Sequence, residues 1–204
     1  MTDHAPNGPA SPLLLTARLR LCAPEPDQAG ALVAFHVRNR EHFAPWDPPC
    51  GPDFHTEDYQ HSRLKRGATA FADGTAYRYW LTPIGDAQRI IGSVHFSNIL
   101  RGASQSCNVG YALDREYEGQ ALMTEALRCA IGEMFSPRIN LHRIQAAFRP
   151  ENWRSAEVLK RLGFVDEGLA NDYLFIDGAW RIHRITALRN AAFVVPAGWA
   201  SAPP

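Results

Sequence analysis

The sequence lacks a surplus of either charge and lacks long apolar runs. Its 204 residues include 21 Lys and Arg and 21 Asp and Glu, so the formal net charge is zero. Proteins that bind nucleic acid or anionic membranes without specificity need a surplus of cations, so we expect no direct nucleic-acid binding. No stretch approaches the roughly 18 apolar residues of a membrane span, and the N-terminus has no basic segment followed by an apolar one. We therefore expect neither a membrane span nor a signal peptide.

Patterns for metal binding and disulfide formation are also lacking. The four cysteines are scattered, without a CxxC pair. The histidines form no HExxH motif or other ligand spacing. We therefore expect no metal site, and a reduced, cytoplasmic compartment fits the cysteine pattern best. A GxSxG elbow, a P-loop and a dinucleotide fingerprint are absent as well.

Apolar periodicity and turn residues divide the chain into one mixed α/β domain between two tails. Residues 1–12, which are rich in Pro, Gly and small polar residues, read as a flexible N-terminal tail. Residues 13–190 read as the domain and residues 191–204 as a C-terminal tail. Asp177-Gly178 predicts a hairpin turn between the last two strands. The patterns predict strands at residues 13–21, 77–82, 89–97, 105–113, 142–148, 169–176 and 180–188, and helices at 27–40, 56–71, 120–135 and 154–162.

Residues 108–134 carry the first candidate site. They read as a strand, a loop containing Gly119, and the helix with the strongest apolar periodicity in the chain. The free N–H groups and the positive dipole at a helix N-terminus can bind a pyrophosphate without a cationic side chain. The alternative is that Gly119 only turns the strand into the helix, and the loop alone does not decide between the two.

Asn152 and Ser155 form the second candidate. Arg149-Pro150 ends a strand, which places Asn152 near the start of a short helix and Ser155 one turn later. An amide can hold an amide-bearing ligand, and a hydroxyl three residues on can deliver a proton on the same side. Both residue types are also favoured as N-caps, which is the alternative interpretation.

Phe43 and Trp46 lie in a proline-rich link, residues 41–52, that we expect to be irregular. Aromatic side chains in such a loop suit a lid or an acceptor groove. They can equally fill the core beneath the loop.

The order and spacing of these elements resemble the GNAT superfamily of acyl-CoA N-acyltransferases, from about residue 13 to residue 188. The order is a strand, a glycine loop, a long helix and a second strand. After them come the motif N-x-x-S and a helix that ends at Gly163-Phe164. The stretches IIGSVHFSNILRG, GQALMTEAL, RLGF and DYLFIDGAW resemble its RimJ/RimL branch, the N-terminal acetyltransferases of bacterial ribosomal proteins. The resemblance implies a single GNAT-like domain, in which helices flank a central twisted, mostly antiparallel sheet with a V-shaped split.

The resemblance also implies where acetyl-CoA lies and which residues hold it. In this family acetyl-CoA occupies the split between the strand ending at Leu113 and the strand of residues 145–148. No metal is implied. The implied binding residues are Tyr111, Ala112 and Leu113, which pair with pantetheine through their backbone; Glu118, Gly119, Gln120, Ala121, Leu122 and Met123 around the pyrophosphate; and Asn152 on the pantetheine arm.

The catalytic residue implied by the resemblance is Ser155, as a general acid that gives a proton to the leaving CoA thiolate. Many family members use a Tyr at the position that is Leu159 here, so Ser155 is preferred. The acceptor amine attacks the thioester directly, without a covalent enzyme intermediate. The base for that amine stays open, with Asp172, Glu167 and His95 as candidates.

The glycine loop departs from the family pattern Gln/Arg-x-x-Gly-x-Gly/Ala. Glu118 stands in place of Gln or Arg, Ala121 in place of the central glycine, and Met123 in place of the last small residue. A carboxylate at Glu118 would repel a pyrophosphate by on the order of 1 kcal/mol. Because Ala is the best helix former, we expect Ala121 to be helical, with its methyl group intruding on the phosphate approach. Acetyl-CoA binding should survive, since most of the cradle is backbone.

The function expected from the sequence is acetyl-CoA-dependent acetylation of an α-amine, with the N-terminus of a ribosomal protein as the acceptor. One alternative keeps the chemistry and takes a small amine or amino-acid derivative as the acceptor. Another alternative is a degenerate acyl-CoA-binding or ribosome-associated protein without turnover. A monomer and a homodimer are both consistent with the sequence.

Overall fold

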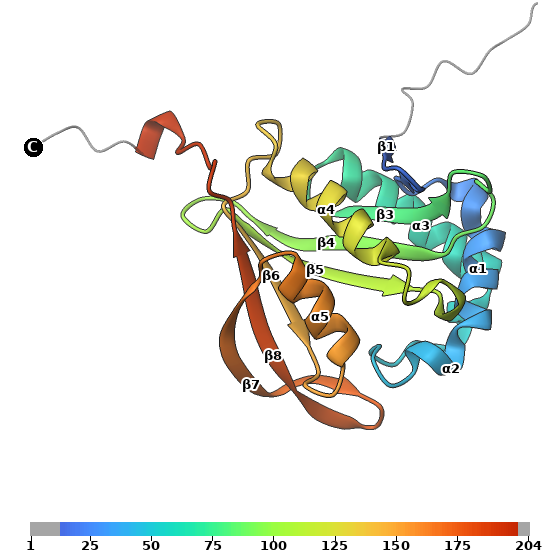
Figure 1. Ribbon diagram of the computed structural model, residues 1–204. Helices are drawn as coiled ribbons and strands as arrows, with labels where there is room; N and C mark the ends of the chain where they lie inside the picture. Colours follow the sequence, from blue (N-terminus) through green and yellow to red (C-terminus); the bar gives the residue numbers. More distant parts are fainter. Residues whose placement is uncertain (1–12, 200–204) are drawn as a thin grey trace, which may run out of the picture.

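An eight-stranded sheet runs through the structure, a computed structural model that describes residues 13–199 (Figure 1). Neighbouring strands are antiparallel except β5 and β6, which are parallel. The predicted mixed α/β domain with a mostly antiparallel sheet is therefore confirmed. The order across the sheet is β1 (Leu13–Leu15), β2 (Leu19–Cys22), β3 (Tyr77–Pro83), β4 (Gly92–Leu100), β5 (Ser106–Leu113), β6 (Arg143–Phe148), β8 (Ala179–Arg189) and β7 (Val165–Ile176).

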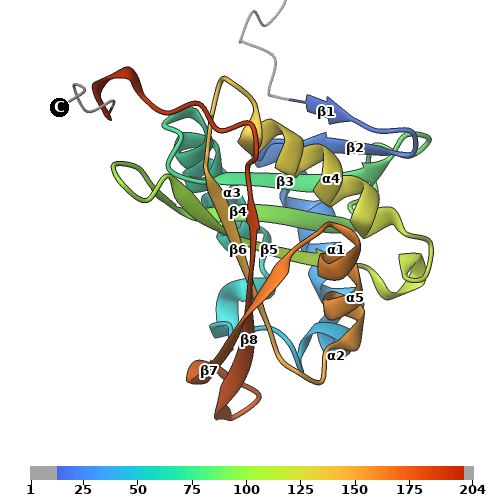
Figure 2. The same ribbon diagram turned by 60° about the vertical axis from the view of Figure 1, so that its left-hand side comes forward.

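Helices cover both faces of the sheet, with α4 and α5 on one side and α1 and α3 on the other (Figures 1 and 2). Tyr79 and Trp80 of β3 show the division, because successive strand residues face opposite sides. Tyr79 is buried in the core under α4, and Trp80 in the core under α1 and α3. The helices are α1 (Ala29–Arg38), α2 (Arg40–Phe43), α3 (Glu57–Ala72), α4 (Leu122–Phe135) and α5 (Trp153–Arg161).

Helix α4 buries the wide apolar stripe that the sequence predicts. Leu127, Ala130 and Met134 are fully buried, at spacings of three and four residues. Burying a Leu or Met side chain contributes about 1.5–3 kcal/mol. The stripe therefore fixes α4 on the sheet, and with it the glycine loop that leads into α4.

The prediction of one continuous strand at residues 13–21 is wrong, because the chain turns between Leu15 and Leu19. β1 and β2 form a hairpin, and Glu125 of α4 holds its turn. The Glu125 carboxylate accepts hydrogen bonds from the Thr16 hydroxyl (2.6 Å) and from Arg18 Nε (2.7 Å). Thr16 and Glu125 are 109 positions apart in the chain, so the local alternation of apolar residues could not reveal this turn.

The four predicted helices are present, with small shifts at their ends. The helix expected at 27–40 begins with a 3-10 turn, Pro26–Gln28, and continues as α1 to Arg38. The link expected to be irregular contains most of the short helix α2. The predicted hairpin turn is confirmed, because β7 pairs with β8 up to Ile176 and Ala179, and both Asp177 and Gly178 have positive φ.

The sheet splits where β5 and β6 separate. Their parallel pairing joins residues 106–109 to residues 143–146 and goes no further. Beyond that point β5 stays paired with β4 as far as Leu113, and β6 stays paired with β8 as far as Phe148. The two halves of the sheet therefore diverge, which confirms the expected V-shaped split.

The segment after β8 is fastened to the domain at its start. Asn190 is buried, and its Nδ2 donates to the Leu141 carbonyl (3.0 Å). The Phe193 ring lies edge-on to the His142 ring at 5.2 Å. Residues 1–12 and 200–204, which the sequence assigns to tails, lie outside the described residues. Within residues 13–199, none of the helices combines the length and the apolar character that crossing a bilayer requires.

A buried ion pair ties α1 to the segment that leads into the glycine loop. The Asp114 carboxylate is almost fully buried and accepts hydrogen bonds from Arg38 Nε (2.5 Å) and Glu116 N (3.1 Å). Burial alone would raise the pKa of Asp114, but the hydrogen bonds from Arg38, Glu116 and Asn39 outweigh it and lower the pKa. Asp114 is therefore charged in the folded protein, and it fixes the 3-10 turn that follows it.

Asp114→Ala should lower the free energy of unfolding by about 3 kcal/mol, because the Arg38 guanidinium is left without its carboxylate partner. This is the lower end of the range for buried pairs, since Arg38 is partly exposed. Urea denaturation followed by circular dichroism measures the change. Asp73→Ala, at the exposed C-cap of α3, is the matched control and should change stability by less than about 0.5 kcal/mol. Equal losses in the two variants would contradict the role of Asp114.

Candidate active site

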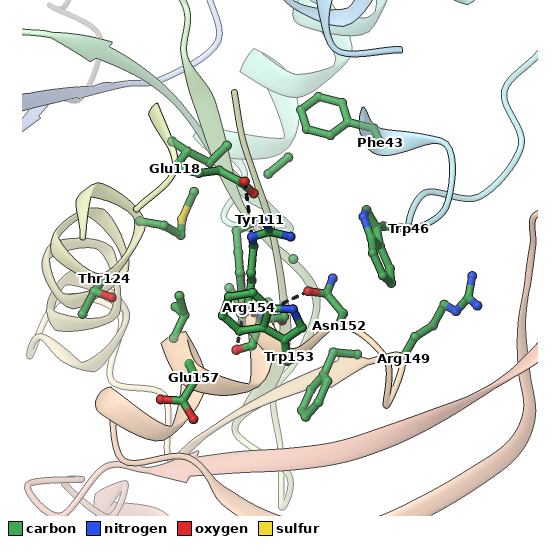
Figure 3. Close-up of a pocket in the computed structure, with 18 of the residues that line it drawn as sticks. Phe43, Trp46, Tyr111, Glu118, Thr124, Arg149, Asn152, Trp153, Arg154 and Glu157 are labelled. Carbon is green, nitrogen blue, oxygen red and sulfur yellow. Dashed lines mark hydrogen bonds and ion pairs between the residues drawn. The ribbon is translucent and has the colours of Figure 1, made fainter. Parts of the chain in front are cut away.

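A cleft of about 640 Å³ opens where β5 and β6 separate (Figure 3). Its walls come from the link after α2, the ends of β5 and β6, the first turn of α4, and α5. Gln120 does not line it, and its carbonyl accepts a hydrogen bond from Arg18 Nη1 (3.0 Å). The other residues that the sequence assigns to acetyl-CoA binding, and the proposed general acid, all line the cleft: Tyr111, Ala112, Leu113, Glu118, Gly119, Ala121, Leu122, Met123, Asn152 and Ser155.

One edge of β5 is open along the cleft. Residues 111–113 pair with β4 on one side, while the pairing with β6 on the other side has already ended at Val109. Backbone N–H and C=O groups on such an edge can pair with an extended ligand as an added strand would. The edge is therefore suited to an amide-bearing chain such as pantetheine.

The glycine loop enters α4 through two left-handed residues. Gly119 has a φ of 75° and Ala121 a φ of 58°, and α4 begins only at Leu122. The expectation that Ala121 is helical is therefore wrong, because the chain must reverse direction before the first helical turn. No side chain caps the N-terminus of α4. Its first N–H groups, at the positive end of the helix dipole, remain available for an anion.

Glu118 lies next to Arg154 and His42 at the mouth of the cleft. Its carboxylate lies 3.3 Å from Arg154 Nε (Figure 3). The same carboxylate lies 3.4 Å from His42 Nε2. The Arg154 guanidinium also lies 4.8 Å from the centre of the Trp153 ring. The repulsion expected between Glu118 and a pyrophosphate is therefore partly offset by Arg154, which the isolated motif could not show.

Asn152 and Ser155 are brought together with the side chain of Tyr111. Asn152 is the N-cap of α5, and its Oδ1 accepts a hydrogen bond from Ser155 N (3.0 Å). The Ser155 hydroxyl oxygen lies 2.7 Å from the Tyr111 hydroxyl, which also donates to the Ser155 carbonyl at 3.3 Å. Asn152 thus acts as a cap, which was one of the two interpretations, and still lines the cleft through the same side chain.

The Tyr111 hydroxyl is a functional group that the sequence analysis missed, since only the backbone of this residue was assigned a role. Burial raises the pKa of Tyr111, although its hydrogen bond with Ser155 opposes the shift. The phenol therefore stays protonated at neutral pH. The alternation of Cys107, Val109 and Tyr111 along one face of β5 was the available signal, because it points the ring toward the side of the sheet covered by α4 and α5.

The two aromatic residues of the link have different roles. Phe43 is buried, with its ring 5.4 Å from that of Phe35, so it fills the core, and it also forms part of the cleft wall. Trp46 is partly exposed and lines the cleft. Arg149, at the end of β6, donates to the Pro45 carbonyl (2.7 Å), and its guanidinium lies 5.5 Å from the centre of the Trp46 ring. Arg149 and Trp46 lie together on one side of the cleft (Figure 3).

Asp47 is a cleft residue that the sequence analysis did not single out. Its side chain is open to the cleft and yet closely surrounded by protein. Partial desolvation by the surrounding protein raises the pKa of Asp47 to about 6, while the charges of Arg63 and Arg78 act in the opposite direction. A carboxylate with this pKa, next to a ligand cleft, is suited to accept a proton near neutral pH.

The three base candidates taken from the sequence do not line the cleft. His95 Nδ1 lies 2.7 Å from Arg78 Nη2, and burial together with the charge of Arg78 lowers the pKa of His95 to about 3. Glu167 is paired with Arg143, and Asp172 lies at an irregular point of β7. Within residues 13–199, no group of three or more His, Cys, Asp or Glu side chains is placed to hold a metal ion.

Ala121→Gly should raise the free energy of unfolding by about 0.5–1 kcal/mol. A left-handed conformation costs Ala roughly 1–2 kcal/mol and costs Gly almost nothing, although Gly loses more backbone entropy on folding. The same substitution at Ala34, an exposed position within α1, should instead lower stability by about 1 kcal/mol. Urea denaturation of both variants measures the two changes. The same sign for both would contradict the strained conformation of Ala121.

Known proteins resemble this chain over most of its length. Residues 18–165 match the Acetyltransferase (GNAT) domain. The ribosomal protein uS5-alanine N-acetyltransferase of Escherichia coli is 37% identical over 175 residues, which are 86% of this chain and 89% of that protein.

Two solved structures share the fold. The ribosomal-protein-S5-alanine acetyltransferase from Vibrio fischeri has a TM-score of 0.85 and 35% identity, covering 90% of this chain and 99% of that one. RimJ of Mycobacterium smegmatis in complex with CoA-disulfide has a TM-score of 0.78 and 29% identity, and the match covers 84% of this chain and 81% of that one. The matched domain, the E. coli relative and the V-shaped split together establish that this chain belongs to the GNAT acetyltransferase family.

Proposed function

We propose that this chain transfers an acetyl group from acetyl-CoA to the α-amine of the N-terminal residue of a ribosomal protein. The observation that carries the proposal is the hydroxyl pair of Tyr111 and Ser155, which stands beside the open edge of β5 at the split. Similarity to the S5-alanine acetyltransferases of E. coli and V. fischeri supports a ribosomal acceptor.

The groups along the cleft fit acetyl-CoA as the co-substrate. Backbone groups of residues 111–113 would hold pantetheine, and the N–H groups of residues 119–123 would hold the pyrophosphate. The Nδ2 group of Asn152 would hold the pantetheine arm, since its Oδ1 already caps α5. The CoA-disulfide bound to the similar RimJ of M. smegmatis supports this assignment.

Ser155 serves as the general acid. As the amine nitrogen bonds to the thioester carbonyl carbon and the C–S bond breaks, the departing sulfur takes the hydroxyl proton of Ser155. The Tyr111 hydroxyl, 2.7 Å from the Ser155 hydroxyl oxygen, can turn its proton toward that oxygen as negative charge develops there. The raised pKa of Tyr111 keeps this donor protonated at neutral pH.

Asp47 serves as the group that receives the α-amine. Above its pKa of about 6 the carboxylate is charged and can accept a hydrogen bond from an N–H group of the neutral α-amine, whose lone pair attacks the thioester carbon. It then takes the proton that the amine loses as the new C–N bond forms. A base with a pKa near the working pH is the most effective one, which supports Asp47 over the neutral His95.

A binding protein without turnover was favoured in the sequence only by Glu118 and Ala121. The pairing of Glu118 with Arg154 weakens this support, because a paired carboxylate repels an incoming phosphate less than an isolated one. Ala121 keeps the loop in the left-handed conformation that a glycine would take. Both departures are therefore compatible with acetyl-CoA binding.

The proposed function is tested by incubating the protein with acetyl-CoA and a panel of N-terminal peptides and small amines, with detection of free thiol. We expect thiol release with peptides that begin with Ala or Ser, and none above background with small amines. Mass spectrometry should place one acetyl group on the peptide α-amine. Thiol release with small amines alone would favour the alternative acceptor. Calorimetric binding of acetyl-CoA without any thiol release would favour the protein without turnover.

Ser155→Ala should lower kcat in the same assay by about 10²–10⁴-fold, because the leaving sulfur loses its proton donor. The KM for acetyl-CoA should stay within a few-fold. Adding Tyr111→Phe to Ser155→Ala should cost little more, since the two hydroxyls act as one unit. Ser62→Ala, an exposed serine of α3, is the control and should keep full activity. Full activity in Ser155→Ala would remove it from the catalytic step.

Asp47→Asn should change the pH profile as well as the rate. In the native protein kcat/KM should fall as the pH drops through about 6, because Asp47 becomes protonated. Protonation of the free acceptor amine should cause a separate fall in kcat/KM as the pH drops below about 8. Asp47→Asn should lose the fall near pH 6, keep the fall below pH 8, and be slower by about 10²-fold. Glu157→Gln, which removes another cleft carboxylate, should keep both falls. An unchanged profile in Asp47→Asn would exclude Asp47 as the base.

A further inference from the structure

Two arginines flank the buried ring of Trp80 on the side of the sheet covered by α1 and α3. The guanidinium carbon of Arg63 lies 5.5 Å from the ring centre and that of Arg78 lies 5.4 Å from it. Arg63 Nη1 lies 3.2 Å from His36 Nε2, and Arg78 Nη2 lies 2.7 Å from His95 Nδ1. We call Arg63, Arg78, His36 and His95 the arginine cluster.

The arginine cluster carries more positive charge than its surroundings balance. In the part of the chain that the structure describes, no carboxylate lies within 4.0 Å of either guanidinium. Burial and the nearby arginines lower the pKa of His36 and of His95 to about 3, so both rings are neutral. Asp47 is the carboxylate whose charge acts on both arginines. Two cations and one anion leave one positive charge without a counterion.

The arginine cluster also has more hydrogen-bond donors than acceptors. A guanidinium carries five N–H donors in a planar fork that matches a carboxylate. The acceptors in contact with Arg63 and Arg78 are the two imidazole nitrogens and the Gln60 side-chain oxygen. The indole N–H of Trp80 is buried and has no partner among the described residues. These three contacts leave most N–H donors of the two guanidiniums without a protein acceptor.

The arginine cluster lies next to the cleft. His95 of β4 is paired directly with Gly110 of β5, and Gly110 lines the cleft. Directly paired residues point to the same face of a sheet, so Gly110 faces the side that carries His95. A side chain added at Gly110 would meet no atom within 4 Å. The face of β5 at Gly110 is therefore open on the side that carries His95, although the residues of the arginine cluster do not themselves line the cleft.

The distance from the cleft to Arg78 fits a peptide better than a single amino acid. Arg78 is paired with His95, so it lies two strands from Gly110, which corresponds to about 10 Å at about 4.8 Å per strand. An extended chain advances about 3.3 Å per residue, so it reaches this distance at about its third or fourth residue. In a free amino acid the amine and carboxylate share one carbon atom and cannot span the gap.

We propose that the arginine cluster binds the carboxylate of an acidic side chain located about three or four residues into the acceptor peptide. The proposal rests on the proposed function, in which the α-amine of the acceptor peptide lies at the split. It adds a second contact between enzyme and peptide, made by an acidic side chain farther along the peptide. Arg63 and Arg78 grip the carboxylate oxygens, and the anion supplies the missing counterion. The chain thereby selects N-terminal sequences that carry Asp or Glu near their start.

Peptide kinetics tests the proposal. A hexapeptide that begins with Ala and carries Gln at positions 2–6 is compared with variants that replace one Gln by Glu or by Lys. With native protein and acetyl-CoA, we expect Glu at one of positions 3–5 to raise kcat/KM about tenfold or more, and Lys at that position to lower it. Arg78→Gln should reduce the ratio of the Glu rate to the all-Gln rate to within about twofold; the ratio is the readout, because loss of the Arg78 charge also raises the pKa of Asp47 and so changes the rate with every peptide.

Matched variants separate binding from folding. Arg128→Gln, an exposed arginine of α4 on the opposite face, should keep the full preference for Glu. If Arg78 were only structural, Arg78→Gln would lower the melting temperature and slow all peptides equally, which would overturn the proposal. Arg78→Lys keeps a charge without the fork and should keep part of the preference, so it replaces Arg78→Gln if that variant does not fold.

The outcomes distinguish failure of this proposal from failure of the proposed function. Equal rates for Glu and Gln peptides at every position, with clear thiol release from both, would overturn the arginine cluster as a carboxylate site and leave the acetyl transfer standing. A preference for Glu that persists in Arg78→Gln would also overturn it. The absence of thiol release with every peptide, the all-Gln peptide included, would instead be a failure of the proposed function.

Discussion

The parallel pairing of β5 with β6 ends at Val109 and Ala146, and the whole site depends on that end. Each strand keeps its other neighbour, so neither half of the sheet loses its stability when they separate. What the separation leaves is a row of backbone N–H and C=O groups on β5 that face a cleft instead of a strand. Unpaired backbone groups are tolerated in a fold only where water or a ligand can reach them. In the proposed function, the interruption of the sheet is thus both the entrance of the site and its main recognition element.

Contacts across the split fix its width. Tyr111 belongs to the β5 half and Ser155 to α5, which follows β6, so their hydrogen bond joins the two halves. The Glu118–Arg154 pair joins the glycine loop to α5, and the hydrogen bond from Arg149 joins the end of β6 to the link after α2. A reacting thioester and a proton donor must be held within a few tenths of an ångström. Tyr111 and Ser155, which are proposed to act in the reaction, therefore also help to hold the two halves of the sheet at a constant distance from each other.

The sequence predicted most of the fold and one wall of the site. Features fixed by local chemistry could be read directly: the apolar stripe of α4, the Asp177-Gly178 turn, and the cap at Asn152. Features fixed by distant residues could not. The turn between β1 and β2 depends on Glu125, and the charge on Glu118 is offset by Arg154. The prediction that Ala121 is helical was wrong because helix propensity describes a residue apart from its tertiary context, whereas the φ of Ala121 is set by the loop that joins β5 to α4. Asp47 carries no sequence signal at all, since its pKa comes from the protein around it.

The two faces of the sheet contribute different groups to the site at the split. The face under α4 and α5 presents the helix N-terminus and the hydroxyl pair, and the face under α1 and α3 presents Asp47 and the arginine cluster. The two sides are coupled through charge. Arg63 and Arg78 lower the pKa of Asp47 against the effect of its surroundings. A carboxylate bound by the arginine cluster would offset their charge and raise the pKa of Asp47 again, which would make it a stronger base. Because that change would occur only with the correct acceptor in place, the acceptor carboxylate that the arginine cluster is proposed to bind would also raise the basicity of Asp47, the residue proposed to activate the amine.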